Sequence, residues 1–278
     1  VIYVEPNPSL LQIVQHNAEV LEVDNITFIN SNFEEAYPTL PIKSFLYLDP
    51  SRRNEQKERV YNPENYTPNI HQIELKLFSN WMIKLSPMVS INQIIEEVKG
   101  IHSIQIIDVN NDCKEINIIG NATQTEDIII STHHYNEHWY CWSGLFNAEE
   151  TTPLKLSEVK DYVFEPWVSV LKSGLYKQLL ISTETSKVAP NTNFFTSEFD
   201  VPHFPGRRFK VLKALKFNKK EIKEATGGKA VILNRNSKYT SANEFAKQYQ
   251  ITQAEPHYLL LFSDIAGKQQ LLLAEKLQ

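Results

Sequence analysis

Polar side chains follow three short apolar runs that have the composition of buried strands. Glu5 follows residues 1–4, Asn30, Ser31, Asn32 and Phe33 end the run that begins at residue 25, and Asp49 follows residues 44–48. Parallel α/β sheets bind ligands outside the carboxyl ends of their strands. A carboxylate there can accept hydrogen bonds from two ribose hydroxyls, and a polar turn can meet the edge of an adenine. The alternative for Glu5 is a loop carboxylate that caps the following helix.

The elements that would position these residues alternate between strand and helix. Strand composition occurs at residues 1–4, 25–30, 44–48, 104–109, 115–119 and 127–132, and helical periodicity occurs at 9–21 and 70–85. Strands separated by helices predict a parallel α/β sheet. The last strands have short links between them, which predicts an antiparallel far edge.

From Glu149 onward the pattern changes. Residues 154–161 and 166–180 read as helices, and 183–205 read as an irregular connection. Asn218 with Glu221, and Ser241 with Glu244, have the spacing of capping boxes that open two further helices, the first ending at Gly227. Strands are expected at 208–217, 229–234, 257–262 and 269–274, the last two forming a hairpin. We therefore expect domains at 1–148, 149–205 and 206–278.

Charge is divided unevenly between these parts. Residues 206–278 hold 14 Lys and Arg against 6 Asp and Glu, whereas residues 1–205 hold 14 against 27. A basic module beside an acidic one favours contact with a phosphate backbone. The expected contacts are Arg207, Arg208, Lys210 and Arg235. The alternative is a solvated face made by Lys213, Lys216, Lys220 and Lys223.

The run VIYVEPNPSLLQIVQHNAEVLEVDNITFINSNF, residues 1–33, resembles the second and third strands and the intervening helix of class I S-adenosylmethionine-dependent methyltransferases. The resemblance implies that Glu5, with Asn7 beside it, holds the cofactor ribose. It also implies that Ser31, Asn32 and Phe33 form the turn beside the adenine, with Asn32 in place of a more usual Asp.

The whole chain is similar to bacterial methyltransferases that contain a THUMP-like domain, through LDPSRR (48–53), FEPWVSVLKSGLYKQL (164–179), RRFKVL and ILNRN. This resemblance implies a Rossmann-like class I methyltransferase sheet, then a small α+β, ferredoxin-like linker region, then a C-terminal THUMP-like α/β domain. It implies S-adenosylmethionine as cofactor and, by analogy with THUMP domains, RNA as partner. Because Val1 would lie inside a strand, we expect the family's first strand and its glycine-rich loop to precede Val1 in a longer protein. We therefore expect this fragment alone to bind the cofactor weakly.

Asp49 and Pro50 match the start of the family motif that lines the methyl-transfer site. Ser51 replaces a second proline and Arg52 replaces an aromatic ring found in many amino-methyltransferases. Arg52 and Arg53 suit an anionic substrate group, such as a phosphate or carboxylate. Asp49 would be the base if a proton must leave; the alternative for Asp49 is a turn residue bonded to the backbone.

Composition excludes some classes of protein and leaves others open. The sequence contains no apolar run of about 18 residues, so we expect no membrane span. Its two cysteines, Cys113 and Cys141, are too few for a disulfide framework, which favours the cytoplasm. His134, His138 and Cys141 lack a further ligand pair, so we expect no metal. Two alternatives to a methyltransferase stand: a nicotinamide-dependent oxidoreductase, since an acid after the second strand also suits a dinucleotide ribose, and a non-catalytic RNA-binding scaffold.

Overall fold

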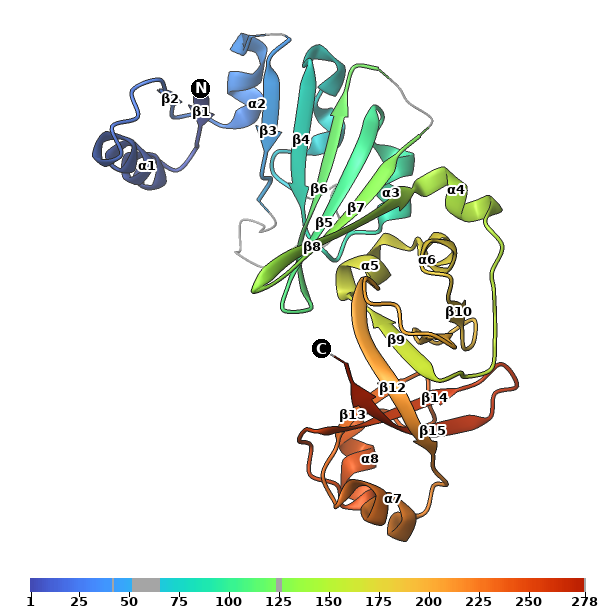
Figure 1. Cartoon of the computed structure of the whole chain (residues 1–278). Helices are drawn as coiled ribbons and strands as arrows, with labels where there is room; N and C mark the ends of the chain where they lie inside the picture. The colour runs from blue at the N-terminus through green and yellow to red at the C-terminus, as the bar shows by residue number, and fades with distance from the viewer. Residues whose placement is uncertain (42, 52–65, 124–126, 278) are drawn as a thin grey trace. The chain divides into compact units, whose positions relative to one another are not determined.

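The computed structural model describes residues 1–41, 43–51, 66–123 and 127–277 of the chain (Figure 1). Two compact units make up the chain: Val1–Ile104 with Glu115–Thr125, and Gln105–Lys114 with Glu126–Gln278. The division falls within two long strands, β5 (Ile101–Val109) and β6 (Asp112–Asn121), rather than at a linker.

The first unit begins with two parallel strands, β1 (Ile2–Val4) and β2 (Thr27–Ile29), joined by helix α1 (Pro8–Val20). The helix begins where predicted because the side-chain oxygen of Asn7 accepts hydrogen bonds from the backbone N–H groups of Ser9 and Leu10. Pro8 is tolerated in the first turn, where its missing N–H has no partner to lose. Strands β1 and β2 form a sheet of their own, distinct from the sheet that contains the next strand.

A six-stranded sheet follows, with the order β3-β4-β6-β5-β7-β8. Its remaining strands are β3 (Phe45–Leu48), β4 (Asn80–Leu85), β7 (Ile129–Asn136) and β8 (His138–Leu145). β3 and β4 are parallel, whereas β6 runs antiparallel to β4 and β8 runs antiparallel to β7. This mixed pattern confirms the expected antiparallel edge. The short helices in this part are α2 (Phe33–Ala36), η1 (Tyr37–Thr39), α3 (Ile91–Glu97) and α4 (Phe146–Thr151).

The predicted helix at 70–85 is wrong. The segment contains two single 3₁₀ turns, η3 (Ile70–Gln72) and η4 (Leu75–Leu77), and then strand β4. Trp81, Ile83 and Leu85 are buried in alternation with more exposed neighbours, which is the period of a strand. Apolar residues at 70, 73, 75, 77, 78, 81 and 85 also fit helical spacing, so periodicity alone gave the wrong class.

The predicted helix at 154–161 is also wrong, because that stretch has no regular structure apart from an isolated bridge between Leu156 and Lys187. The predicted helix at 166–180 is two helices, α5 (Val168–Ser173) and α6 (Tyr176–Ser182). Gly174 separates them with φ of +76°, a conformation that glycine adopts without a steric penalty. The connection at 183–205 is not wholly irregular, since it contains β10 (Ser186–Lys187) and β11 (Phe195–Ser197).

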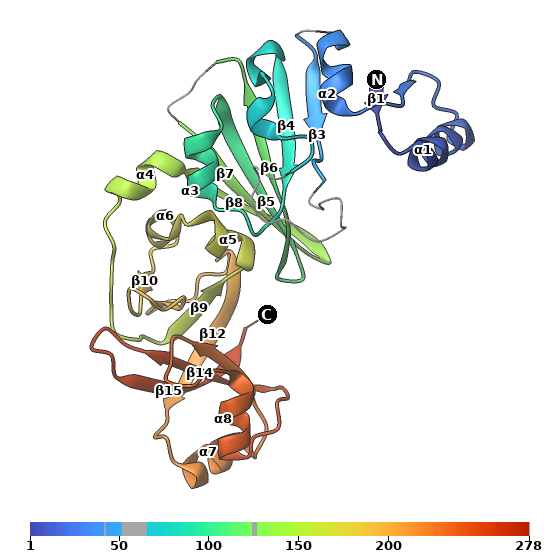
Figure 2. The same ribbon diagram turned by 180° about the vertical axis from the view of Figure 1, so that it is seen from behind.

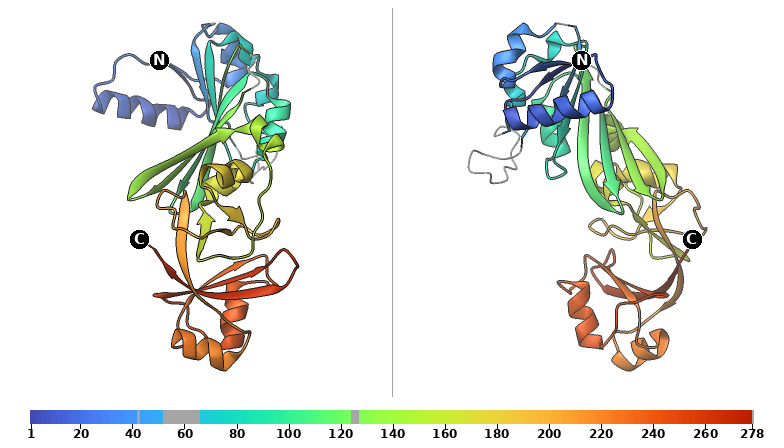
Figure 3. Two further views of the ribbon diagram at one scale, coloured as in Figure 1. Left: turned by 45° about the vertical axis from the view of Figure 1, so that its right-hand side comes forward. Right: turned by 90° about the vertical axis from the view of Figure 1, so that its left-hand side faces the viewer.

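A seven-stranded sheet organises the second unit, with the order β10-β11-β9-β12-β15-β14-β13. Its other strands are β9 (Tyr162–Pro166), β12 (Gly206–Ala214), β13 (Val231–Arg235), β14 (His257–Ser263) and β15 (Gln269–Lys276). β14 and β15 form the predicted hairpin. Helices α7 (Lys219–Thr226) and α8 (Ala242–Tyr249) lie on one face of the β12–β15 part (Figures 2 and 3).

Both predicted capping residues are confirmed in these two helices. The Asn218 side chain accepts from the N–H groups of Lys220 and Glu221, and the Ser241 hydroxyl accepts from that of Glu244. Ile222 and Phe245 then bury one face of each helix against the sheet. The opposite face of the sheet packs against Val188 and Phe194, from the connection before β11.

Candidate active site

Glu5 and Asn30 meet at the carboxyl end of the β1–β2 pair, as their strand positions predict. The Asn30 side-chain amide donates to the carbonyls of Glu5 (2.8 Å) and Pro6 (3.1 Å). Glu5 Oε1 accepts a hydrogen bond from the N–H of Asn7 at 2.8 Å. In the described part of the chain, the other carboxylate oxygen of Glu5 makes no hydrogen bond. Glu5 therefore presents a fixed turn and an available acceptor.

The other residues expected around the cofactor have more varied surroundings. The Asn7 side-chain oxygen is used by the helix cap of α1. Asn32 has the position of an N-cap for α2, yet its side chain makes no cap hydrogen bond. Ser31 Oγ donates to Glu35 Oε2 at 2.9 Å. The Phe33 ring contacts that of Tyr37, which in turn contacts Phe78 beside the six-stranded sheet.

Asp49 forms an ion pair that the sequence analysis missed. It follows β3, and the parallel register of β3 and β4 brings it beside Lys84, whose Nζ lies 2.8 Å from Asp49 Oδ2. Glu115 lies 3.9 Å from the same ammonium. The hydrogen bond from Lys84 to Asp49 raises the pKa of the Lys84 ammonium above its ordinary value. Burial and the nearby Asp49 carboxylate raise the pKa of the Tyr47 phenol.

The backbone after Asp49 is held in place on one side. Pro50 is buried, and Ser51 pairs with Thr67 through hydrogen bonds of 2.7 and 3.2 Å between their backbone groups. Arg52 and Arg53 lie outside the described residues. Glu5 follows a strand of the two-stranded sheet, whereas Asp49 follows a strand of the six-stranded sheet. The hydrogen bonds described above therefore form two groups, one around Glu5 and one around Asp49.

The expected nucleic-acid contacts are mostly engaged with carboxylates. Glu165, only 3% exposed, pairs with Arg207 through Oε2 and with Arg235 through Oε1. Arg208 pairs with Asp200. Lys210 is exposed. The two pairings of Glu165 cannot be predicted from sequence spacing, because Glu165 lies 42 and 70 residues away from its two arginines.

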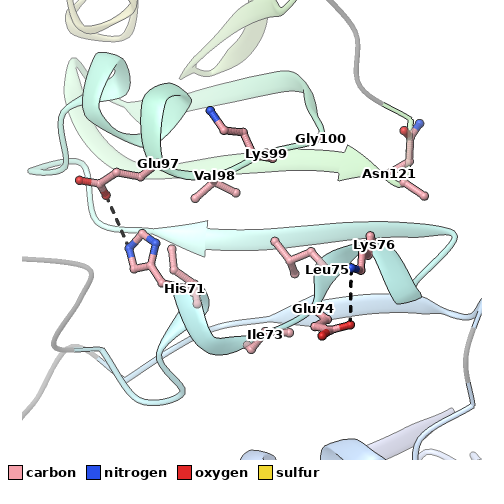
Figure 4. A pocket seen from close by; sticks show the side chains of 12 residues that line it. His71, Ile73, Glu74, Leu75, Lys76, Glu97, Val98, Lys99, Gly100 and Asn121 are labelled. Atoms are coloured by element: carbon pink, nitrogen blue, oxygen red, sulfur yellow. Dashed lines mark ion pairs between the residues drawn. The ribbon is translucent and has the colours of Figure 1, made fainter.

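A cavity of about 460 Å³ lies elsewhere in the first unit (Figure 4). Its lining comes from residues 70–76, from 97–100 and from the end of β6, and His71 pairs with Glu97 across 3.5 Å. It contains none of the residues predicted for the cofactor or the reaction. Asn121, which lines it, pairs with Asn80 at the amino end of β4, whereas Asp49 follows the carboxyl end of the parallel neighbour β3.

The histidine-rich stretch forms the β7–β8 hairpin rather than a helix, so His134 and His138 are not one helical turn apart. His134 is buried, lies 2.5 Å from Asp108 through Nδ1, and stacks on Trp167 with ring centroids 4.0 Å apart. Among the residues that the structure describes, no group of three or more His, Cys, Asp or Glu side chains is gathered to hold a metal ion. Likewise, no described helix is both long and apolar enough to cross a membrane.

Comparison with known proteins assigns the parts of this arrangement. Residues 162–205 match a ferredoxin-like domain and residues 206–276 match a THUMP domain-like family. The chain is similar to the crystal structure of a "putative methyltransferase from Porphyromonas gingivalis W83", with a TM-score of 0.85 and 22% identity over 100% of this chain and 71% of that one. Among proteins with curated descriptions, none matches this sequence. The likeness confirms the expected fold: an α/β sheet with a ferredoxin-like piece and a C-terminal THUMP-like domain.

Proposed function

We propose that the protein is an S-adenosylmethionine-dependent methyltransferase that acts on RNA. The observation that carries the proposal is the likeness of the whole chain to a structure described as a methyltransferase, together with a THUMP domain-like match at 206–276. The acids Glu5 and Asp49 follow parallel strands, where ligands of such sheets bind. The proposed domains are residues 1–148 for methyl transfer, 149–205 for the ferredoxin-like linker and 206–278 for the THUMP-like part.

The residues at the end of the β1–β2 pair fit the nucleoside part of this cofactor. Glu5 has an unused carboxylate oxygen that can accept from ribose hydroxyls, and its turn is already fixed by Asn30. Asn32 keeps its side-chain amide out of the helix cap, so that amide is available to an adenine edge. Asn7, Ser31, Phe33 and Asp49 complete the proposed cofactor contacts.

Asp49 and Lys84 are proposed to act as one unit on the substrate. When bound, S-adenosylmethionine supplies a methyl group already activated by its sulfonium, so the protein mainly aligns the acceptor and excludes water. The Lys84 ammonium holds Asp49 through Oδ2, which leaves Oδ1 to accept a proton from the attacking group. Lys84 is charged at neutral pH, as lysines ordinarily are, and its raised pKa reflects the hydrogen bond by which it keeps the carboxylate oriented. Pro50 shapes this turn, and Arg52 and Arg53 are proposed to bind an anionic part of the substrate.

RNA is the proposed partner because residues 206–278 carry a net formal charge of +8, from 14 basic and 6 acidic side chains. Lys210 is the exposed member of the predicted contacts. Arg207, Arg208 and Arg235 would contribute the guanidinium N–H groups that their carboxylate partners leave unused. Cys113 and Cys141 are free thiols, which supports a reducing compartment such as the cytoplasm.

Calorimetric titration of S-adenosylmethionine into the full-length gene product tests the cofactor proposal. We expect saturable binding, no binding of NAD under the same conditions, and roughly tenfold weaker binding for Glu5→Gln, which is the loss of about one hydrogen bond to a charged group. Glu19→Gln, on the exposed surface of α1, is the matched control and should bind as the unmodified protein does.

Two outcomes would redirect the proposal. Binding of NAD instead would favour an oxidoreductase. Absence of any cofactor binding, with salt-dependent RNA binding retained, would leave a non-catalytic RNA-binding scaffold.

A further inference from the structure

The β7–β8 hairpin places a cysteine directly opposite a histidine. Figure 1 labels the two strands β7 and β8. His133 and Cys141 are register partners on these antiparallel strands. The Cys141 sulfur lies 3.2 Å from His133 Nδ1, within hydrogen-bonding distance. The second ring nitrogen, Nε2, lies 3.1 Å from Ser131 Oγ, two residues earlier on the same face of β7. The three side chains thus form a thiol, a base and a group that orients the base.

The two contacts of the His133 ring are compatible with one arrangement of the protons. If the Cys141 thiol donates to Nδ1, the neutral ring carries its hydrogen on Nε2 and donates it to Ser131 Oγ. Burial lowers the pKa of His133 below its ordinary value, which keeps the ring neutral, and therefore able to accept a proton, at neutral pH. Cys141 itself is an exposed residue of the hairpin.

The other cysteine of the chain provides an internal contrast. Cys113 is partly buried, and burial together with the charge of Asp108 raises the pKa of its thiol to about 11. At pH 7 very little of Cys113 is then the reactive thiolate. Asp108 and Asp112 raise this pKa and Lys172 lowers it.

We propose that Cys141 is a nucleophilic thiol that hydrogen peroxide oxidises to a sulfenic acid, with His133 as the general base. The thiol proton moves to His133 Nδ1 while the sulfur attacks one peroxide oxygen and the O–O bond breaks. The leaving hydroxide takes the proton from Nδ1 and departs as water. Sulfur is oxidised by two electrons and the peroxide is reduced, so one thiol and one peroxide give one sulfenic acid and one water. This reactivity is independent of methyl transfer.

The test treats the whole protein at pH 7 with hydrogen peroxide in the presence of dimedone, which traps sulfenic acids, and maps the adduct by peptide mass spectrometry. We expect the adduct on Cys141 and none on Cys113. His133→Ala should lower the rate of labelling by roughly tenfold, a modest general-base effect compared with full enzymes. His133→Asn keeps a polar group beside the thiol but has no base of similar strength. We therefore expect it to lower the rate of labelling at Cys141 as well.

His138→Ala is the matched control, because His138 lies on the same hairpin opposite Asn136 and not opposite the thiol. It should label as fast as the unmodified protein. Circular dichroism identifies any variant that fails to fold, and either His133 variant suffices for the comparison. Equal labelling of Cys113 and Cys141, or labelling of a folded His133 variant at the unmodified rate, would overturn the proposal.

Discussion

Two clusters in the molecule join a carboxylate to basic side chains, and burial separates their roles. Asp49 meets Lys84 at the end of two parallel strands, where the two side chains are 48% and 29% exposed. Glu165 meets Arg207 and Arg235 with only 3% of its own side chain exposed. A partly hydrated pair stabilises the fold little but keeps a charged group oriented, whereas a buried carboxylate depends on its partners. The first cluster is therefore suited to chemistry and the second to holding β9, β12 and β13 together.

The largest expected effect is on stability at Glu165. Glu165→Gln removes the charge that Arg207 and Arg235 share, and we expect the free energy of unfolding to fall by about 3 kcal/mol, as for other broken buried pairs. Urea denaturation followed by circular dichroism measures it. Glu158→Gln, at an exposed site in the same unit, should change stability by less than about 0.5 kcal/mol. An equally small change at Glu165 would refute the distinction between the clusters.

Asp49→Asn should affect the rate of methyl transfer strongly and the stability of the fold only slightly, the opposite of the pattern expected for Glu165→Gln. It removes the proposed proton acceptor and weakens the hold of Lys84, so we expect the rate of methyl transfer to fall at least roughly tenfold. Stability should change by less than about 1 kcal/mol, because the pair is partly hydrated. Initial rates with a tritiated methyl donor and a urea titration give the two readings. Asp24→Asn, at an exposed site, serves as the control. If Asp49→Asn lowered stability but left the rate of methyl transfer of the folded protein unchanged, a chemical role for Asp49 would be refuted.

The Asp49–Lys84 pair also predicts a dependence on alkaline pH. The folded-state pKa of Lys84 is raised above 10.5, so the stabilisation is fully present below pH 10.5 and is lost as pH rises through the folded pKa. Lys84→Met removes this contribution. We expect the unmodified protein and the variant to differ in thermal midpoint near pH 9 and to converge at higher pH. A difference that persists above the folded pKa would assign the effect to packing of the lysine stem instead.

The smallest expected effect concerns RNA binding by Lys210. This exposed lysine is proposed to make one phosphate contact, so Lys210→Ala should reduce the slope of log affinity against log salt by about 1 without altering stability. Arg207→Ala should lower both affinity and stability, because the Arg207 side chain also binds Glu165. Fluorescence anisotropy with labelled RNA at several salt concentrations measures the slope. Lys155→Ala, outside the basic region, is the control, and an unchanged slope for Lys210→Ala would remove this residue from the interface.

Local signals in the sequence predicted local structure well. Asn218 and Ser241 each mark the start of a helix because a cap needs only the next three residues. Glu5 and Asn30 were expected together because parallel strands align their carboxyl ends. The β4 strand was missed because its apolar residues fit two periods, and Lys84 was missed with it. Glu165 and its arginines could not be predicted, because strand order, not spacing, brings them together.

The position of β15 in the seven-stranded sheet has a consequence for the newly made protein. β15 comes last in sequence, yet it lies between β12 and β14 and is the link between the group β10-β11-β9-β12 and the pair β14-β13. During translation the two groups are made first and stay unjoined until residues 269–276 leave the ribosome. A premature stop codon shortly before Gln269 would thus keep six of the seven strands of this sheet and still release a protein with two open sheet edges, a substrate for chaperones and proteases.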